Sequence, residues 1–140
     1  MFAIGREGVI SDKVLQVINV SCNTLLASEA LLCDRFYNRM RGLLGKKELL
    51  PGKGLIIKPC QQIHSFFMQF SFDALFVDNF NRVIHIEGNM LPGKISPLVR
   101  KTAMVIELPA GTAADTGTNI GNIIVLEPVL KPQNDYGGLC

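Results

Sequence analysis

A cysteine and a histidine stand close together in the middle of the sequence, as Cys60 and His64. A thiolate activated by a neighbouring imidazole is a nucleophile when the two side chains lie within hydrogen-bond reach. A proline before the cysteine and two glutamines after it indicate a loop, in which residues four apart need not meet. A metal site would need both residues to converge with His85 and a carboxylate. We expect no metal and no cofactor, and keep the pair of Cys60 and His64 as one basis for a small hydrolase.

Two carboxylic acids are embedded in apolar stretches. Asp73 lies between a phenylalanine-rich segment and the apolar residues 74–77, and Glu107 interrupts the apolar residues 104–108. Apolar surroundings raise the pKa of a carboxyl group unless hydrogen-bond donors compensate. Two carboxyl groups in unequal environments are suited to general acid–base hydrolysis, with Asp73 or Glu107 as the base. A strand acid also commonly accepts hydrogen bonds from loop amides and fixes a turn, and this structural role is the one we expect for both.

Four of the eight phenylalanines lie within residues 66–72. Core packing explains most of such a run, but part of it can also wall an apolar cleft with a few polar groups at its rim. We predict a ligand cleft beside residues 63–72. Its expected walls are Phe67 and Met68, and its expected polar contacts are His64, Asp73, Arg41 and Glu107.

Charge is uneven along the chain although its total is small. The net charge is +2, from 14 Lys and Arg against 12 Asp and Glu, which by itself implies no polyanionic partner. Residues 35–58 are nevertheless strongly basic. A guanidinium that faces a cleft, such as that of Arg41, binds a carboxylate or phosphate through two hydrogen bonds. Aromatic residues do not alternate with the basic ones, and no groove-reading motif is present, so we predict no nucleic-acid binding.

The elements that must position these side chains are mostly strands. Alternating or β-branched runs predict extended segments at 14–20, 25–27, 55–57, 65–72, 74–77, 82–87, 102–108 and 123–126. Apolar residues at steps of three and four predict an amphipathic helix over 29–44, and a helical turn is expected at 112–115. The order of elements predicts an α+β fold: one compact domain with a mostly antiparallel sheet of about six to seven short strands and one main amphipathic helix.

Length and cysteine use bound the class of protein. A chain of 140 residues is expected to form one domain, here residues 13–128, between tails at 1–12 and 129–140. The four cysteines form no C-x-x-C pair, and the first ten residues contain charged residues and glycines instead of a secretory leader. No uninterrupted apolar stretch approaches 18 residues, which excludes a membrane-spanning helix. These features favour a protein of the reducing cytoplasm with four free thiols.

Five short blocks occur in a fixed order along the body of the chain. They are R-x-R-G-L-L-G at 39–45, G-L-I-I-x-P-C at 54–60, I-H-S-F-F-M at 63–68, D-A-L-F-V-D at 73–78 and E-L-P-A-G at 107–111. In this series the chain resembles domain of unknown function family 192, over residues 13–127. The resemblance implies a compact single-domain α+β fold with no established activity. Members often carry Trp where Phe67 stands, and Gly-Asp where Gly121-Asn122 stands.

The absence of a complete catalytic spacing favours a non-catalytic binding or accessory module with a cleft for a small polar or anionic ligand. Two alternatives stay open. One is a small cytoplasmic hydrolase that uses Asp73, Glu107 or the pair of Cys60 and His64. The other is a module that docks a protein partner through an exposed aromatic or basic surface.

Overall fold

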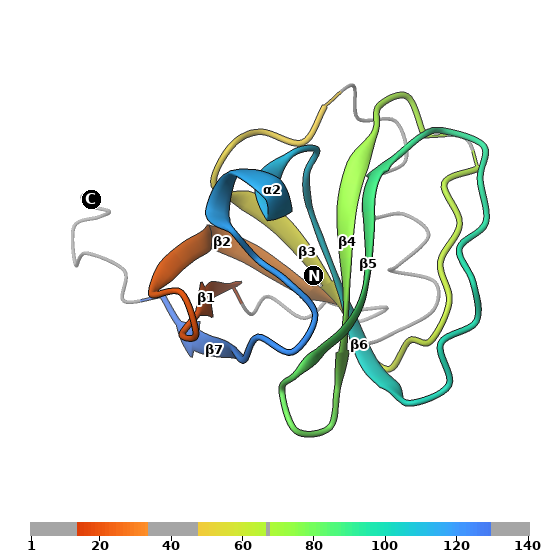
Figure 1. Cartoon of the computed structure of the whole chain (residues 1–140). Coiled ribbons are helices and arrows are strands. Elements are labelled where there is room, and N and C mark those ends of the chain that lie inside the picture. The colour runs from red at the N-terminus through yellow and green to blue at the C-terminus, as the bar shows by residue number, and fades with distance from the viewer. Residues whose placement is uncertain (1–13, 34–47, 67, 130–140) are drawn as a thin grey trace, which may run out of the picture.

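The computed structural model describes residues 14–33, 48–66 and 68–129 (Figure 1). These ranges contain seven strands and one short helix. The elements are β1 (Val14–Asn19), β2 (Thr24–Cys33), β3 (Lys53–Ile57), β4 (Phe72–Asp78), β5 (Val83–Met90), β6 (Thr102–Pro109), α2 (Thr112–Thr116) and β7 (Ile124–Pro128). All strands belong to one sheet in the order β5-β4-β6-β3-β2-β1-β7. Only the β2–β3 pair is parallel, so the prediction of a mostly antiparallel sheet is confirmed.

The hairpin between β4 and β5 forms where the sequence predicts it. Its turn is fixed by Asp78, whose Oδ1 accepts hydrogen bonds from the backbone amides of Phe80 at 2.8 Å and Arg82 at 2.9 Å. Asn81 has a φ of 66°, in the left-handed region that asparagine tolerates better than most residues. The polar residues between the two strands therefore reverse the chain and set the register of β4 against β5.

The amphipathic helix predicted from residue 29 is wrong over its first turn and a half. Residues 29–33 are the second half of β2, which pairs with β1 on one side and β3 on the other. Pairing on both sides overrides the helical spacing of the apolar residues, because a central strand satisfies all its backbone groups through its neighbours. The rest of the predicted helix, 34–44, lies outside the described residues. None of the helices in the described ranges is long and apolar enough to cross a membrane.

The sheet curls so strongly that its two edge strands meet at one end (Figure 1). Arg82, just before β5, bridges to Ile123, just before β7. Three backbone hydrogen bonds join the same segments, from Val83 N to Asn122 O at 2.9 Å, Gly121 N to Val83 O at 2.8 Å and Ile124 N to Asn81 O at 2.8 Å. The curl encloses one face of the sheet, which we call the inner face, and leaves the outer face to be covered by other segments.

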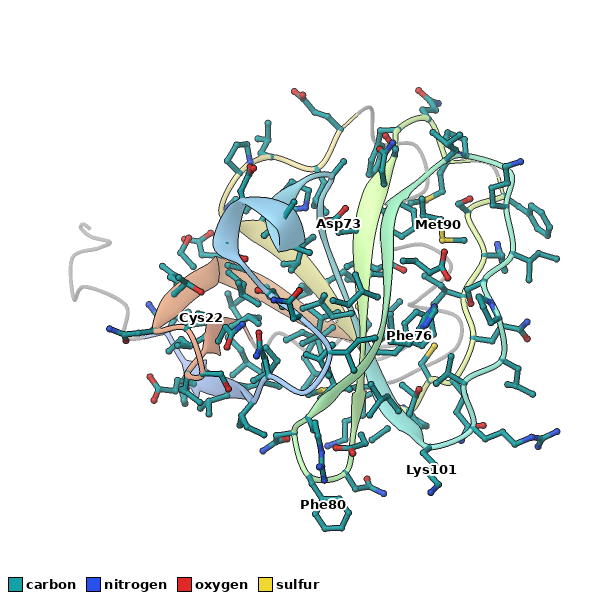
Figure 2. All side chains as sticks on the ribbon, viewed as in Figure 1. Cys22, Asp73, Phe76, Phe80, Met90 and Lys101 are labelled. Atoms are coloured by element: carbon teal, nitrogen blue, oxygen red, sulfur yellow. The ribbon has the colours of Figure 1, made fainter. Side chains whose placement is uncertain are left out.

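Each face carries its own apolar cluster. The inner cluster takes side chains from all seven strands and from Ala113 of α2. The outer cluster centres on β3, β4 and β6 and includes Phe72 and Phe76. Figure 2 shows Phe76 beside β5, on the side turned away from α2. Because β3, β4 and β6 are buried on both faces, every polar side chain on these strands needs either a local partner or a function.

Two loops cover part of the outer face and replace the extended segment predicted at 65–72. Residues 60–66 and 91–100, here called the paired loops, run side by side through an isolated bridge between His64 and Ile95. Backbone bonds from Ser65 N to Lys94 O and from Ser96 N to Ile63 O extend the pairing. The segment bends after Phe66, and only Phe72 enters a strand. The alternation of phenylalanines therefore does not mark a strand.

Candidate functional site

Three strand ends converge beside the base of the paired loops. β3 and β4 both end where the antiparallel β6 begins, because Ile57 pairs with Val105 and Asp78 pairs with Thr102. Two open hollows of about 500 and 340 Å³ lie there and share Gln61, Asn79 and Thr102. The remaining lining residues are Lys58, Pro59, Cys60, Gln62 and Ala103 in the larger hollow, and Asp78, Phe80, Arg100 and Lys101 in the smaller. Volumes of this order suit a small molecule.

The hollows are electropositive. Lys58, Arg100 and Lys101 line them, and none of the three forms an ion pair with a described residue. Asp78, a carboxylate among the described lining residues, is engaged by the turn of its own hairpin. The backbone amide of Arg82, and then that of Phe80, holds the pKa of Asp78 below its ordinary value. Figure 2 shows Lys101 and Phe80 at the same end of the sheet.

Thr102 lines both hollows and carries a buried hydroxyl without a partner. Thr102 is buried, and its Oγ1 has no hydrogen-bond partner; within the described ranges only Thr24 shares this property, and it lines neither hollow. An unpaired buried hydroxyl typically costs about 1–3 kcal/mol. A ligand that offers an oxygen to Thr102 would recover that cost. The amides of Gln61, Gln62 and Asn79 add further donors and acceptors to the wall.

The predicted nucleophilic pair is not assembled. The Cys60 thiol is buried and donates to the carbonyl oxygen of Gln62 at 3.2 Å. His64 is exposed, accepts a hydrogen bond at Nδ1 from the amide of Phe66 at 3.2 Å, and stacks on the Phe66 ring. No hydrogen bond joins Cys60 to His64, both of which the structure describes. Over the described ranges, no three His, Cys, Asp or Glu side chains gather in a way that could hold a metal ion.

Asp73 lies on the inner face and ties the start of α2 and the β5 bulge to β4. Its Oδ1 accepts from the amides of Asn89 at 2.8 Å and Gly111 at 3.1 Å, and its Oδ2 accepts from the amide of Ala113 at 2.8 Å. Two of these amides belong to the start of α2, and Figure 2 shows Asp73 beside that helix. All three bonds hold backbone in place. The geometry is that of the structural role expected from the sequence, a strand acid fixing turns.

Glu107 lies on the outer face, in the middle of the sheet. Unlike Asp73, its carboxyl group lies among apolar side chains. It pairs with Leu55 on β3 and Ala74 on β4, two residues that contribute only apolar side chains. No described residue gives its carboxyl group a hydrogen bond or an ion pair, and burial raises the pKa of Glu107 to about 8. On β5, Glu87 and His85 occupy the same face and pair with each other at 2.6 Å. Burial thus favours the protonated, neutral form of Glu107.

The predicted site residues that the structure describes do not all lie in one recess. Asp73 and Glu107 lie on opposite faces of the sheet, and His64 points to solvent from the paired loops. Met68 is half-buried and packs against the outer cluster, on the same face as Glu107. Arg41 and Phe67 lie outside the described residues.

The hollow itself was missed by sequence reasoning. Its residues come from three separate segments, 58–62, 78–80 and 100–103, and each segment alone has the composition of an ordinary loop or strand end. One signal was available: Arg100 and Lys101 directly precede the strand at 102–108, as Lys58 directly follows the strand at 55–57. Two neighbouring antiparallel strands place the end of one beside the start of the other, so these cations had to meet.

Comparisons with known proteins place the chain in a family. The family model of domain of unknown function 192, described as "Uncharacterized ACR", matches residues 17–126. A protein of unknown function from Novosphingobium aromaticivorans DSM 12444 superposes with a TM-score of 0.70 at 23% identity, covering 80% of this chain and 83% of that one. A protein from Sinorhizobium meliloti 1021, described as a candidate transcription regulator, gives a TM-score of 0.71 at 21% identity over 84% and 95% of the two chains. No curated protein matches. At these identities the two structures show a shared fold alone.

Proposed function

Because the chain belongs to the family of domain of unknown function 192, whose description names no activity, we propose a function from local geometry: it binds a small anionic ligand without transforming it. The proposed site is the hollow between Lys58 and Thr102 at the base of the paired loops. It differs from the cleft expected from the sequence, beside residues 63–72, in position but not in the class of ligand.

One observation carries this proposal: Thr102, whose buried hydroxyl has no partner, lines a hollow whose cations form no ion pair with a described residue. Taken alone, surface lysines and arginines indicate little, because most of them are simply solvated. A buried hydroxyl with no partner is different, since folded proteins rarely leave one unless a water or ligand completes it. The combination of one inner donor and three peripheral cations matches a carboxylate or phosphate group that enters with one oxygen toward Thr102.

None of the candidate catalytic groups in the described ranges forms an assembled nucleophile, which supports binding over catalysis. Cys60 and His64 have separate partners, and the carboxylate of Asp73 is occupied by three amides. Glu107 keeps an unusual environment, but it lines neither hollow. A hydrolase based on Glu107 would therefore work from a different place than the proposed anion site.

The test is a titration of the full chain with inorganic phosphate, citrate and glycerol, followed by thermal unfolding and by calorimetry. Phosphate or citrate at ten times its dissociation constant should add about 1.4 kcal/mol of stability, and uncharged glycerol none at the same concentration. Thr102→Val should weaken anion binding without lowering the stability of the unliganded protein. The double variant Lys58→Gln/Lys101→Gln should abolish it, whereas Lys94→Gln, a cation of the paired loops outside the hollow, should leave it unchanged.

Two results would contradict the proposal. The first is anion binding that survives the double variant unchanged. The second is binding of a mixed-sequence DNA duplex with no response to either small anion, a comparison included because one structural relative is described as a candidate transcription regulator. A chemical change in a bound phosphate ester would contradict only the non-catalytic part.

A further inference from the structure

A second surface lies next to the hollow and has a different character. We propose that the outer surface of the paired loops, residues 60–66 and 91–100, docks a segment of a partner protein that carries both apolar and acidic side chains. This surface is distinct from the small-ligand site, because its exposed apolar side chains and Lys94 line neither hollow, although the cations Lys58, Arg100 and Lys101 at its edge do.

The first observation is a concentration of exposed apolar side chains. Phe66 is 38% exposed, Leu91 50%, Ile95 60% and Leu98 48%. These are four of the nine large apolar side chains that stand exposed in the described ranges, and all four lie in two loops that are bonded together. Single exposed apolar residues are normal on a protein surface, whereas a group on one face marks an interaction site.

The second observation is charge, which identifies the partner. The segments 58–72 and 91–106 contain Lys58, Lys94, Arg100 and Lys101 and no aspartate or glutamate. The numbers of basic and acidic residues in the whole chain are nearly equal. These two segments are therefore basic because of where the charges lie in the sequence, not because the whole protein is basic. A surface that combines exposed apolar groups with uncompensated cations complements a partner that combines apolar groups with carboxylates.

The third observation is that the surface is held in a fixed shape. Backbone bonds cross between the loops from Ser65 N to Lys94 O at 2.8 Å, from Gly93 N to Ser65 O at 2.9 Å and from Val99 N to Gln61 O at 2.9 Å. The buried Ser65 hydroxyl also donates to Leu91 O at 2.6 Å and accepts from Lys94 N at 2.9 Å. A surface ordered before binding loses little conformational entropy when a partner docks, which favours affinity.

The pattern of exposure favours a peptide segment over an anionic membrane. Along the first loop, exposed His64 and Phe66 alternate with buried Ile63 and Ser65, so the outward side chains form a row along the loops. A row suits successive side chains of an extended segment. The basic hollow at one end of the loops accepts a single protruding carboxylate, a feature that a flat bilayer surface does not require.

The experiment measures binding of three fluorescein-labelled twelve-residue peptides to the full chain by anisotropy. One peptide interleaves Leu and Phe with Asp and Glu, the second replaces every acid by Lys, and the third replaces every apolar residue by Ser. The acidic apolar peptide should bind saturably and each of the others at least about tenfold more weakly. Ile95→Ser/Leu98→Ser and Lys94→Glu should each weaken the first peptide by about tenfold or more. Ile120→Ser, at an exposed apolar residue outside the paired loops, is the matched control.

Equal binding of the acidic and basic peptides, or binding that is unaffected by Ile95→Ser/Leu98→Ser, would overturn the proposal. So would binding to vesicles of phosphatidylserine and phosphatidylcholine with none to the acidic peptide. The substituted residues are exposed, and circular dichroism of each variant establishes that it is folded. Because Ile95, Leu98 and Lys94 line neither hollow, loss of peptide binding with intact phosphate binding separates this surface from the anion site.

Discussion

Asp73 and Glu107 are buried carboxylic acids on neighbouring strands, and their surroundings are opposite. Asp73, on the inner face, accepts hydrogen bonds from three backbone amides, one at the β5 bulge and two at the start of α2. Glu107, on the outer face, receives no hydrogen bond from any described residue and has its pKa raised to about 8 by burial. The register places Asp73 opposite Leu108 and Glu107 opposite Ala74, one position apart along the strands.

The difference between these two acids distinguishes two kinds of buried polar group in this fold, those whose hydrogen bonds hold the structure and those free for a function. Around α2, buried polar groups are satisfied by segments that the curl of the sheet brings together. On the outer side, Glu107 and Thr102 are buried without such partners in the described ranges. A buried polar group that stabilises nothing costs free energy, so its persistence needs another reason. Four substitutions test whether a buried polar group stabilises the fold because of its hydrogen-bond partners and not because of its residue type.

Replacing Asp73 by alanine should have the largest effect. The change leaves three buried amides at the start of α2 and at the β5 bulge without an acceptor, and we expect the free energy of unfolding to fall by about 4 kcal/mol. Urea denaturation measures the loss. Asp73→Asn, which keeps one acceptor oxygen, should lose roughly half as much. A loss below about 1 kcal/mol in Asp73→Ala would mean that the three bonds do not hold the turns.

Glu107→Gln should instead stabilise the protein at high pH. The folded-state pKa of about 8 lies above the ordinary value of 4.5, so the folded state holds a proton that the unfolded state releases. The contribution of Glu107 is therefore fully present below pH 4.5 and is lost as the pH rises to about 8. At pH 7 the Gln variant should already exceed the native protein by about 3 kcal/mol, and at pH 4 the two should nearly coincide. Parallel pH-dependent curves for the two proteins would show that Glu107 is not a neutral acid in the folded state.

Ser65→Ala tests whether partners matter on the outer side too. The Ser65 hydroxyl is buried among the paired loops and has both a donor and an acceptor partner. Its removal should cost about 2 kcal/mol, unlike the loss of the unpartnered Thr102 hydroxyl in Thr102→Val, which should cost nothing or stabilise slightly. Thermal unfolding of the two variants gives the comparison. Similar losses in both would remove the distinction between partnered and unpartnered hydroxyls.

Asn122→Asp should have the smallest effect. Within the described ranges the side chain of Asn122 forms hydrogen bonds through Oδ1 alone, which accepts from the amide of Asn119 at 2.8 Å, Nδ2 of Asn19 at 3.0 Å and Sγ of Cys22 at 3.5 Å. A carboxylate supplies the same acceptor, so the free energy of unfolding at pH 7 should change by less than about 0.5 kcal/mol. Asn122→Ala, which removes the acceptor, should cost at least about 1 kcal/mol. If the Asp variant is as unstable as the Ala variant, the amide nitrogen also has a role.

Much of the sheet could be predicted from the sequence because alternation along a strand is a local property. The runs 102–108 and 82–87 have the side-chain period of strands, and the polar residues between 77 and 82 have the composition of a hairpin turn. Residues 29–33 were misassigned because their apolar spacing fits a helix as well as a strand, and only the pairing with β1 and β3 decides between the two. The strand predicted at the phenylalanine run, 65–72, was wrong for a related reason, because the alternating pattern continues through a loop.

The sequence by itself determined that both acids must be buried, because each is flanked by strongly apolar strand residues. Only the tertiary structure decided what each acid meets there. The amides that engage Asp73 come from residues 16, 38 and 40 positions further along the chain, and the curl of the sheet brings them to it. The same folding gathers Lys58, Thr102 and their neighbours into one hollow from strands that are adjacent in space but distant in sequence. A local pattern fixes which face a side chain takes, whereas the partners on that face depend on the path of the whole chain.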